Sequence, residues 1–189
     1  MPDHPTPSRN RSGRHPAAQR GFSLVEVCVV IALGAVLLTL AVPGFGALLE
    51  RQRLHGSAAQ LAADLQWLRS EALARNEALR FSLHADTQGS CTVVHTGLRN
   101  QCRCEGSGPA LCEAGVVVLK TSHWPASERI TVQANVASMV FDPVQGTTTP
   151  AGSVRLSDSQ GRGITHVVNI MGRIRSCSPS ALVPGYRAC

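Results

Sequence analysis

Aromatic side chains are scarce in this sequence, where four Phe, two Trp and one Tyr make up 4% of the 189 residues. Any hydrophobic core must therefore rest on Leu, Val, Ile and Ala, whose spacing along the chain indicates helices and strands. The length is sufficient for one membrane segment and one further domain of moderate size.

Catalytic motifs are also lacking. The sequence contains no G-x-S-x-G, no H-E-x-x-H and no G-x-x-x-x-G-K-[ST]. Its carboxylates are few and unpaired, and its seven His residues are scattered. Two of these, His95 and His166, fall in predicted strands, where a structural role is the commoner one. We predict a protein that is not an enzyme and has no cofactor, no metal and no small-molecule substrate.

Acidic residues are nearly absent from the two ends of the chain, although Arg is frequent there. The first 21 residues carry one acid, Asp3, and the residues from Ala151 onward also carry one, Asp158. The arginines of these ends are Arg9, Arg11, Arg14, Arg20, Arg155, Arg162, Arg173, Arg175 and Arg187. A basic end of this kind predicts an anionic partner such as nucleic acid or phospholipid, and a solvated surface is the alternative.

Charge is missing again in residues 22–42, with Glu26 as the exception. A helix of this length spans about 30 Å, the thickness of the hydrocarbon core of a bilayer. The run is longer than the apolar part of a secretory signal, and no Ala-x-Ala cleavage site follows it. Because the arginines before the run outnumber Arg51 and Arg53 after it, the positive-inside rule predicts a single-pass segment with a cytoplasmic N-terminus.

Helical spacing continues in residues 43–78. Pro43 and Gly44 are expected to kink or loosen the helix rather than end it. Beyond them, apolar residues recur at alternating steps of four and three and so form one stripe along an amphipathic helix. The stripe comprises Leu54, Ala58, Leu61, Leu65, Leu68 and Ala72. The sequence therefore predicts one long helix whose second half needs a covering surface.

Short β-rich segments separated by Gly, Pro and Asp occupy residues 79–189. The expected strands are residues 79–84, 91–95, 115–120, 129–134, 137–142, 153–158 and 164–172. Their short spacings favour antiparallel hairpins. The predicted fold class is α+β, with a long N-terminal helix, membrane-spanning in its first half, packed on an antiparallel sheet or sheets.

Six of the seven cysteines follow the apolar run, and Cys28 lies inside it. The six are Cys91, Cys102, Cys104, Cys112, Cys177 and Cys189. An even set beyond a membrane segment predicts disulfides in an oxidising compartment, with fifteen possible pairings. Residues 96–114 are expected to form a disulfide-tied loop, and the last two cysteines would close a short C-terminal loop. The alternative, a zinc site made by the three cysteines of residues 96–114, has the wrong spacing.

Residues 21–45, "GFSLVEVCVVIALGAVLLTLAVPGF", resemble the processing site and N-terminal helix of type IV pilins and type II secretion pseudopilins. The resemblance implies that prepilin peptidase removes a cytoplasmic leader, residues 1–21, after Gly21 and that the new terminus, Phe22, is methylated. Glu26 then becomes the fifth mature residue, where these proteins carry Glu.

A carboxylate at the centre of a membrane helix costs at least about 2.5 kcal/mol and is a functional candidate. The alternative is that Glu26, near the start of the apolar run, lies at the headgroup level and snorkels to water. In a filament, Glu26 could pair with the amino group of a neighbouring Phe22. Burying one ion requires a partner, so this pair would favour one stagger between subunits.

Residues 137–177 resemble the C-terminal part of the GspH/FimT group of minor pilins and pseudopilins. With the N-terminal helix, the resemblance covers most of residues 21–177 and is weakest in residues 96–114. It implies a type IV pilin-like fold. The segment "GRIRSC" (172–177) matches the G-R-x-R element of the FimT branch, which is associated with DNA binding during natural transformation.

Physical reasons support DNA contact at this element. In an extended segment, Arg173 and Arg175 face the same way, and each guanidinium can bind a phosphate with two hydrogen bonds. Gly172 removes a side chain where the backbone must come close. Arg187, with Arg162 as a further candidate, would enlarge the patch if the C-terminal loop folds back.

The resemblance leaves two functions open. The first is a minor type IV pilin that enters a pilus and binds double-stranded DNA non-specifically for uptake. The alternative is a structural minor pseudopilin of a type II secretion system with no DNA binding. Either function implies other pilins or pseudopilins, prepilin peptidase and the bacterial inner membrane as partners. The C-terminal domain would be periplasmic, and extracellular once assembled in a filament.

Overall fold

One helix precedes all the strands. The structure, a computed structural model, describes residues 21–104, 108–179 and 183–189, and the side chains of residues 40–44 lie outside this description. The helix, α1, spans Leu24–Arg75. The chain divides into two units, residues 1–43 and residues 44–189. The predicted leader lies outside the described residues except for Gly21.

In the first unit, the described large apolar side chains of the helix are exposed. Leu24 is 80% exposed, Ile31 65% and Leu37 67%. Cys28 is exposed and forms no disulfide. Within the described residues, no helix holds an apolar stretch long enough to cross a membrane. The predicted span, residues 22–42, ends in residues whose side chains are not described and stays a prediction.

In the second unit, α1 buries one face, and this face is the predicted stripe. All six stripe residues, from Leu54 to Ala72, have no accessible surface. Their spacing repeats every three to four residues, so they line one side of the helix. Fully burying a Leu side chain contributes about 1.5–3 kcal/mol, so the stripe is a major source of the stability of this unit.

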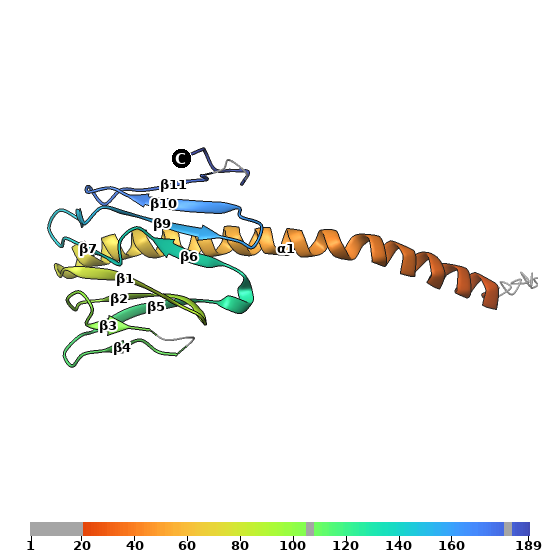
Figure 1. Cartoon of the computed structure of the whole chain (residues 1–189), viewed down its shortest axis with the longest axis horizontal. Helices are drawn as coiled ribbons and strands as arrows, with labels where there is room; N and C mark the ends of the chain where they lie inside the picture. Colours follow the sequence, from red (N-terminus) through yellow and green to blue (C-terminus); the bar gives the residue numbers. More distant parts are fainter. Residues whose placement is uncertain (1–20, 105–107, 180–182) are drawn as a thin grey trace, which may run out of the picture. The chain divides into compact units, whose positions relative to one another are not determined.

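Two antiparallel sheets cover the stripe (Figure 1). The first has the strand order β5-β2-β1-β7-β8 and the second the order β11-β10-β9-β6. The strands of the first sheet are β1 (Leu79–Asp86), β2 (Gly89–His95), β5 (Val118–Pro125), β7 (Ser138–Phe141) and β8 (Thr148–Thr149). Those of the second are β6 (Thr131–Ala134), β9 (Gly152–Ser157), β10 (Gly163–Val168) and β11 (Ile174–Cys177). A 3-10 turn, η1 (Ala126–Glu128), joins β5 to β6.

The core combines side chains from the helix and from both sheets. Phe81 of β1 and Phe141 of β7 represent the first sheet, and Leu156 of β9 and Ile164 of β10 represent the second. All four are at most 1% exposed. The α+β class, with one long helix packed on antiparallel sheets, is therefore confirmed.

A buried carboxylate ties the helix to the first sheet. Asp64 lies beside the stripe and is only 5% exposed. Lys120 of β5 lies 2.5 Å from one of its oxygens, and the Ser122 hydroxyl donates to the other at 3.0 Å. Because both oxygens are paired, this polar residue tolerates burial.

The six predicted cysteines form three disulfides. Cys91 pairs with Cys104, Cys102 with Cys112, and Cys177 with Cys189. The first ties residues 96–114 to β2. The second joins the two strands of a small hairpin within that segment, β3 (Cys102–Arg103) and β4 (Leu111–Cys112). The zinc alternative is wrong because disulfide bonds occupy all three thiols.

Two strands have different bounds in the structure from those predicted. The strand expected at residues 115–120 begins at Val118. The strand expected at residues 164–172 ends at Val168, and a separate strand, β11, begins at Ile174. The chain reverses between them in a turn where Gly172 has a φ of 68°. This left-handed conformation suits glycine and cannot continue a strand.

Candidate functional site

A surface pocket of about 330 Å³ lies between the helix and the start of β11. Its lining side chains and backbone belong to two segments far apart in the sequence. They are Gln66 and Arg69 of α1, and Gly172, Arg173, Ile174 and Arg175. The structure therefore places both arginines of the G-R-x-R element on one pocket and adds a third arginine from the helix.

The helix residues that line the pocket lie next to the buried stripe. Gln66 follows stripe residue Leu65, and Arg69 follows Leu68, so both lie on the flank of the helix. Gln66 is exposed, and Arg69 is half-buried. The Arg69 Nε donates a hydrogen bond to the Gly146 carbonyl at 3.0 Å. Gly146 lies in the turn between β7 and β8.

The opposite wall is the turn between β10 and β11. Asn169 holds it, because its amide donates to the Arg173 carbonyl at 3.1 Å and its side-chain oxygen accepts from the Arg173 amide at 2.9 Å. The Gly172 amide donates to the Asn169 carbonyl at 2.8 Å. These bonds fix the backbone from which Arg173 projects.

Gly172 is required by its surroundings as well as by its φ. A Cβ at this position would lie 2.1 Å from the Gly146 carbonyl oxygen and 2.9 Å from the Arg69 Nε. Both distances are far below van der Waals contact, so no other residue fits without moving the backbone. The close approach that the structure shows at Gly172 is to the Gly146 turn, and the predicted approach of this backbone to DNA stays a prediction.

The pocket is strongly cationic. Arg173 and Arg175 are exposed, whereas Ile174 between them is half-buried against the core. Of the residues that the structure describes, no carboxylate lines the pocket. Among the described residues, none forms an ion pair with Arg69, Arg173 or Arg175. Like charges gathered without a counter-ion attract an anion.

Arg162, by contrast, has partners elsewhere. Its Nε lies 2.6 Å from an Asp158 oxygen, and its Nη2 lies 3.8 Å from Glu50 of α1. The Ser159 hydroxyl also donates to Glu50. This arginine therefore holds the turn between β9 and β10 against the helix, and it does not line the pocket. Its expected contribution to the patch is not supported.

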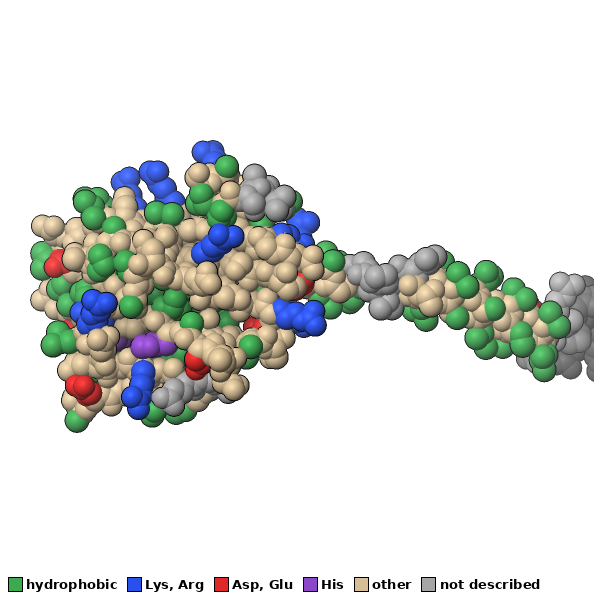
Figure 2. Space-filling view, viewed as in Figure 1, with side chains coloured by type: hydrophobic (Ala, Val, Ile, Leu, Met, Phe, Trp, Pro, Cys, Tyr) green, Lys and Arg blue, Asp and Glu red, His purple; other side chains and the backbone are tan. Residues whose placement is uncertain are grey.

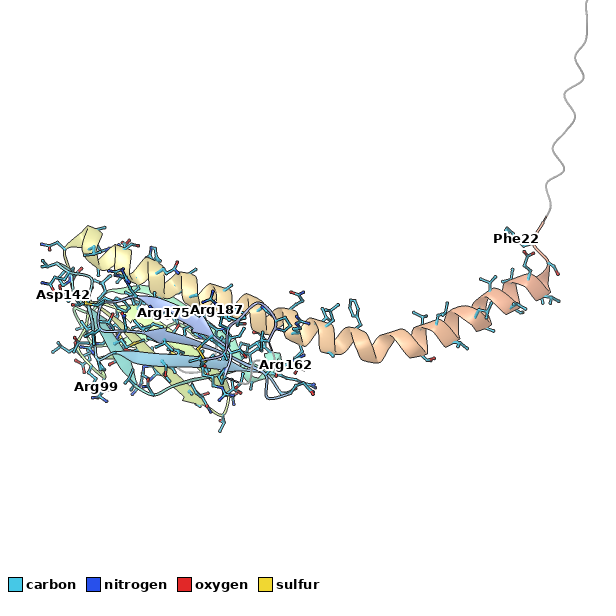
Figure 3. The ribbon with its side chains drawn as sticks, turned by 90° about the horizontal axis from the view of Figure 1, so that it is seen from above. Phe22, Arg99, Asp142, Arg162, Arg175 and Arg187 are labelled. Atoms are coloured by element: carbon cyan, nitrogen blue, oxygen red, sulfur yellow. A yellow bond between two sulfur atoms is a disulfide. The ribbon has the colours of Figure 1, made fainter. Side chains whose placement is uncertain are left out.

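Arg187 lies in the C-terminal segment, which folds back beside β11. The Ser178 amide donates to the Arg187 carbonyl at 2.8 Å, and the Cys177–Cys189 disulfide closes the loop. Arg187 is exposed but does not line the pocket. In Figure 3, Arg187 lies between Arg175 and Arg162. Lys and Arg side chains also stand along the edge where Figure 1 places β11 and the C-terminus (Figure 2).

The predicted processing and assembly residues lie at the start of the described chain. Gly21 and Phe22 precede α1, and Phe22 is 81% exposed. Glu26 lies in the first turn of the helix and is exposed. With Phe22, Val27 and Val30 it lines a shallow hollow of about 230 Å³.

The two histidines of the predicted strands are buried beside hydroxyl groups. A His95 ring nitrogen lies 3.0 Å from the Ser82 hydroxyl. Burial, reinforced by Arg80 and then His84, lowers the pKa of His95 to about 4. His166 lies 2.8 Å from the Ser176 hydroxyl, and burial lowers its pKa, with the Ala58 carbonyl opposing the shift. Both rings have no accessible surface, which fits a structural role.

Sequence reasoning missed Gln66 and Arg69. Their positions immediately after two stripe leucines were a usable signal, because such residues border the buried face. What the sequence could not supply was the segment facing them, since that depends on how the second sheet packs on the helix.

Comparison with known proteins gives two family matches. A model described as type II transport protein GspH matches residues 57–172, and a model described as prokaryotic N-terminal methylation motif matches residues 16–42. A search of curated proteins found no match.

Two solved structures are similar, both of the type IV minor pilin FimU from Pseudomonas aeruginosa. The crystal form in space group P21 has 22% identity and a TM-score of 0.49, over 72% of this chain and 96% of the FimU chain in that structure. The form in P65 has 21% identity and a TM-score of 0.46, over 70% of this chain and 98% of the FimU chain in that structure.

Proposed function

Because the chain belongs to the GspH family of type IV pilins and pseudopilins, we propose that it is a minor type IV pilin that binds DNA through Arg173 and Arg175. The family is one of structural proteins that associate with other pilins in a filament. The DNA-binding role and the choice of a pilus over a secretion pseudopilus are our proposals.

The pocket between α1 and β11 carries this proposal. Among the described residues, three arginines and no carboxylate line it, and hydrogen bonds fix the turn that holds Arg173. A guanidinium can donate two parallel hydrogen bonds to one phosphate, which makes Arg well suited to a phosphodiester backbone. Phosphate contacts carry no sequence information, so the binding would be non-specific.

Salt sensitivity is the quantitative signature of this mode. Each neutralised phosphate contributes about 0.9 to the slope of log K against log salt for duplex DNA, and non-specific dissociation constants are typically about 10⁻⁴–10⁻⁶ M at physiological salt. We expect affinities in this range, with Arg187 adding a weaker contact from the neighbouring segment.

The test is a titration of fluorescent duplex DNA with the full-length protein in non-ionic detergent. Changing Arg173→Ala/Arg175→Ala should weaken binding by about 100-fold, since each charged hydrogen bond contributes about 1.5 kcal/mol or more. The control is Arg53→Ala/Arg155→Ala, which removes the same charge from exposed positions outside the pocket. Equal affinity of the pocket variant and wild type would exclude binding through Arg173 and Arg175, and no binding by either at low salt would exclude DNA binding.

Filament entry is the second part of the proposal, and it rests on the N-terminal methylation motif. We propose that prepilin peptidase cleaves after Gly21, that Phe22 is methylated and that Glu26 pairs with a neighbouring subunit. The uncleaved protein would cross the bacterial inner membrane once, with a cytoplasmic leader and a periplasmic second unit. That unit would become extracellular in a pilus.

The alternative, a structural pseudopilin without DNA binding, has one observation in its favour. Val144 is 75% exposed, Ile170 65% and Met171 58%. Val144 lies on the β7–β8 turn, and Ile170 and Met171 lie on the β10–β11 turn. The two turns adjoin, because the amide of Thr148, the first residue of β8, donates to the Ile170 carbonyl. Exposed apolar side chains from adjoining turns are typical of protein contacts. The DNA titration separates the two functions, because the pseudopilin role predicts no binding.

A further inference from the structure

Arg69 occupies an unusual position between two turns and the helix. Its Nε donates to the Gly146 carbonyl at 3.0 Å. Gly146 and Gly172 both approach this nitrogen so closely that a Cβ on either would lie within 3.0 Å of it. The side chain therefore runs through a gap that exists because both turns carry glycine at their closest point.

The outer edge of the Arg69 guanidinium remains available. Within the part of the chain that the structure describes, Nε is the Arg69 nitrogen with a protein acceptor, and Nη1 and Nη2 have none. The group is planar, so the bond at Nε fixes the direction of the Nη1/Nη2 edge. Arg69 also lines the pocket with Arg173 and Arg175. Three guanidinium groups from two separate elements thus share one hollow.

We propose that Arg69 is a third phosphate-binding residue, which contacts a DNA phosphate through Nη1 and Nη2 while its bond to Gly146 holds it in place. This inference rests on the DNA binding proposed for Arg173 and Arg175. It assigns the site to two elements, the flank of α1 and the β10–β11 turn. The DNA backbone therefore lies across the helix flank rather than along β11 alone.

A purely structural role for Arg69 makes a different prediction, and Arg69→Gln distinguishes the two. In Gln, the side-chain nitrogen is bonded to Cδ, as Nε is in Arg. The variant can therefore keep the hydrogen bond to Gly146 while it loses the charge and the Nη1/Nη2 edge. A structural role predicts wild-type DNA binding for this variant.

The experiment titrates duplex DNA with the full-length protein in non-ionic detergent, between about 50 and 200 mM salt. For Arg69→Gln we expect an unchanged melting temperature, affinity weaker by about tenfold and a salt slope smaller by about 0.9. The matched control is Arg75→Ala on the same helix, where Arg75 pairs with Glu71 at 2.5 Å. Its slope should equal that of the wild type.

The outcomes are separable. If Arg173→Ala/Arg175→Ala binds DNA like the wild type, the proposed function fails. If that variant loses binding while Arg69→Gln retains both affinity and slope, the role of Arg69 alone is overturned. A measurement on the wild-type protein tests the role of Arg69 even if the variants do not fold. Phenylglyoxal modification of Arg69, mapped by mass spectrometry, should fall when DNA is present, and equal modification with and without DNA would also overturn the inference.

Discussion

At the scale of single residues, the site depends on two glycines that belong to different turns. The Gly172 Cα faces the Gly146 carbonyl, and the same carbonyl accepts the hydrogen bond from Arg69. Gly172 therefore has two constraints, a φ of 68° and a backbone oxygen where its Cβ would be. Gly161, in the β9–β10 turn, has the first constraint without the second, since its φ is 77° and a Cβ there would meet no atom within 4 Å.

This difference predicts the relative cost of two substitutions. Gly161→Ala should lower the free energy of unfolding by about 1–2 kcal/mol, the usual cost of a left-handed conformation for a residue with a Cβ. Gly172→Ala adds a clash with backbone that cannot move freely, so its loss should exceed that of Gly161→Ala by about 1 kcal/mol or more. Urea unfolding of both variants measures the costs. Equal losses would show that the contact between the two turns is not tight.

At the scale of elements, His95 and Ser82 join β2 to β1 through a buried hydrogen bond. The Gly97 amide donates to His95 Nδ1 at 3.1 Å, so the ring proton lies on Nε2 and points to the Ser82 hydroxyl at 3.0 Å. Protonating Nδ1 would remove the acceptor for Gly97 and place a charge near Arg80, whose Nε donates to the Gly97 carbonyl at 3.1 Å. The neutral ring is therefore the form that fits these strands.

A pH dependence of stability follows. The pKa of His95 is lowered from 6.5 to about 4, so the unfolded chain binds a proton in this interval and the folded chain does not. The free energy of unfolding should therefore fall as the pH falls from about 6.5 towards 4 and gain nothing from His95 above 6.5. His166, whose pKa burial also lowers, acts in the same direction.

Urea unfolding at pH 7 and pH 5, where most carboxylates stay ionised, tests this prediction. The wild type should lose stability at pH 5, and His95→Gln should lose less because part of the linked proton uptake is gone. The loss that persists in the variant is expected from His166. If wild type and variant lose the same amount, His95 titrates normally in the folded protein.

The elements also show how much of the fold could be predicted from the sequence. The stripe from Leu54 to Ala72 could be predicted because helical periodicity records which face is buried. The class of the sheets and the existence of disulfides followed from spacing and cysteine number. The break between β10 and β11 was missed, because the apolar residues Ile170 and Met171 continue the pattern of a strand through an exposed turn. The close approach of Arg69 to Gly172 in that turn is a tertiary contact that the local sequence pattern does not encode.

At the scale of the whole molecule, the chain consists of two units that differ in how far their apolar side chains are buried. Residues 44–189 bury their own core between a helix and two sheets, and three disulfides tie that unit. The described apolar residues of the first unit, such as Leu24 and Ile31, are exposed. An apolar helix surface of this kind is stable in lipid or among other such helices. Family membership makes the second environment a filament.

We propose that Glu26 governs how these helices pack in a filament, and this proposal predicts the behaviour of a charge variant. A carboxylate buried among apolar helices without a partner costs several kcal/mol, whereas pairing with the amino group of a neighbouring Phe22 offsets that cost. Glu26→Ala would remove the proposed pair and leave the neighbour's amino group buried without a counter-charge. We expect this variant to reach the membrane at the wild-type level and to enter filaments far less often.

The measurement is the fraction of the protein in sheared filaments relative to the membrane fraction, read by immunoblot. Glu71→Ala is the matched control, because it removes a carboxylate from the same helix within the second unit, where Glu71 pairs with Arg75. It should enter filaments normally. Because we propose that leader removal precedes assembly, mass spectrometry of each variant must show the same N-terminus at Phe22. Wild-type filament entry by processed Glu26→Ala would mean that the stagger between subunits does not depend on this charge.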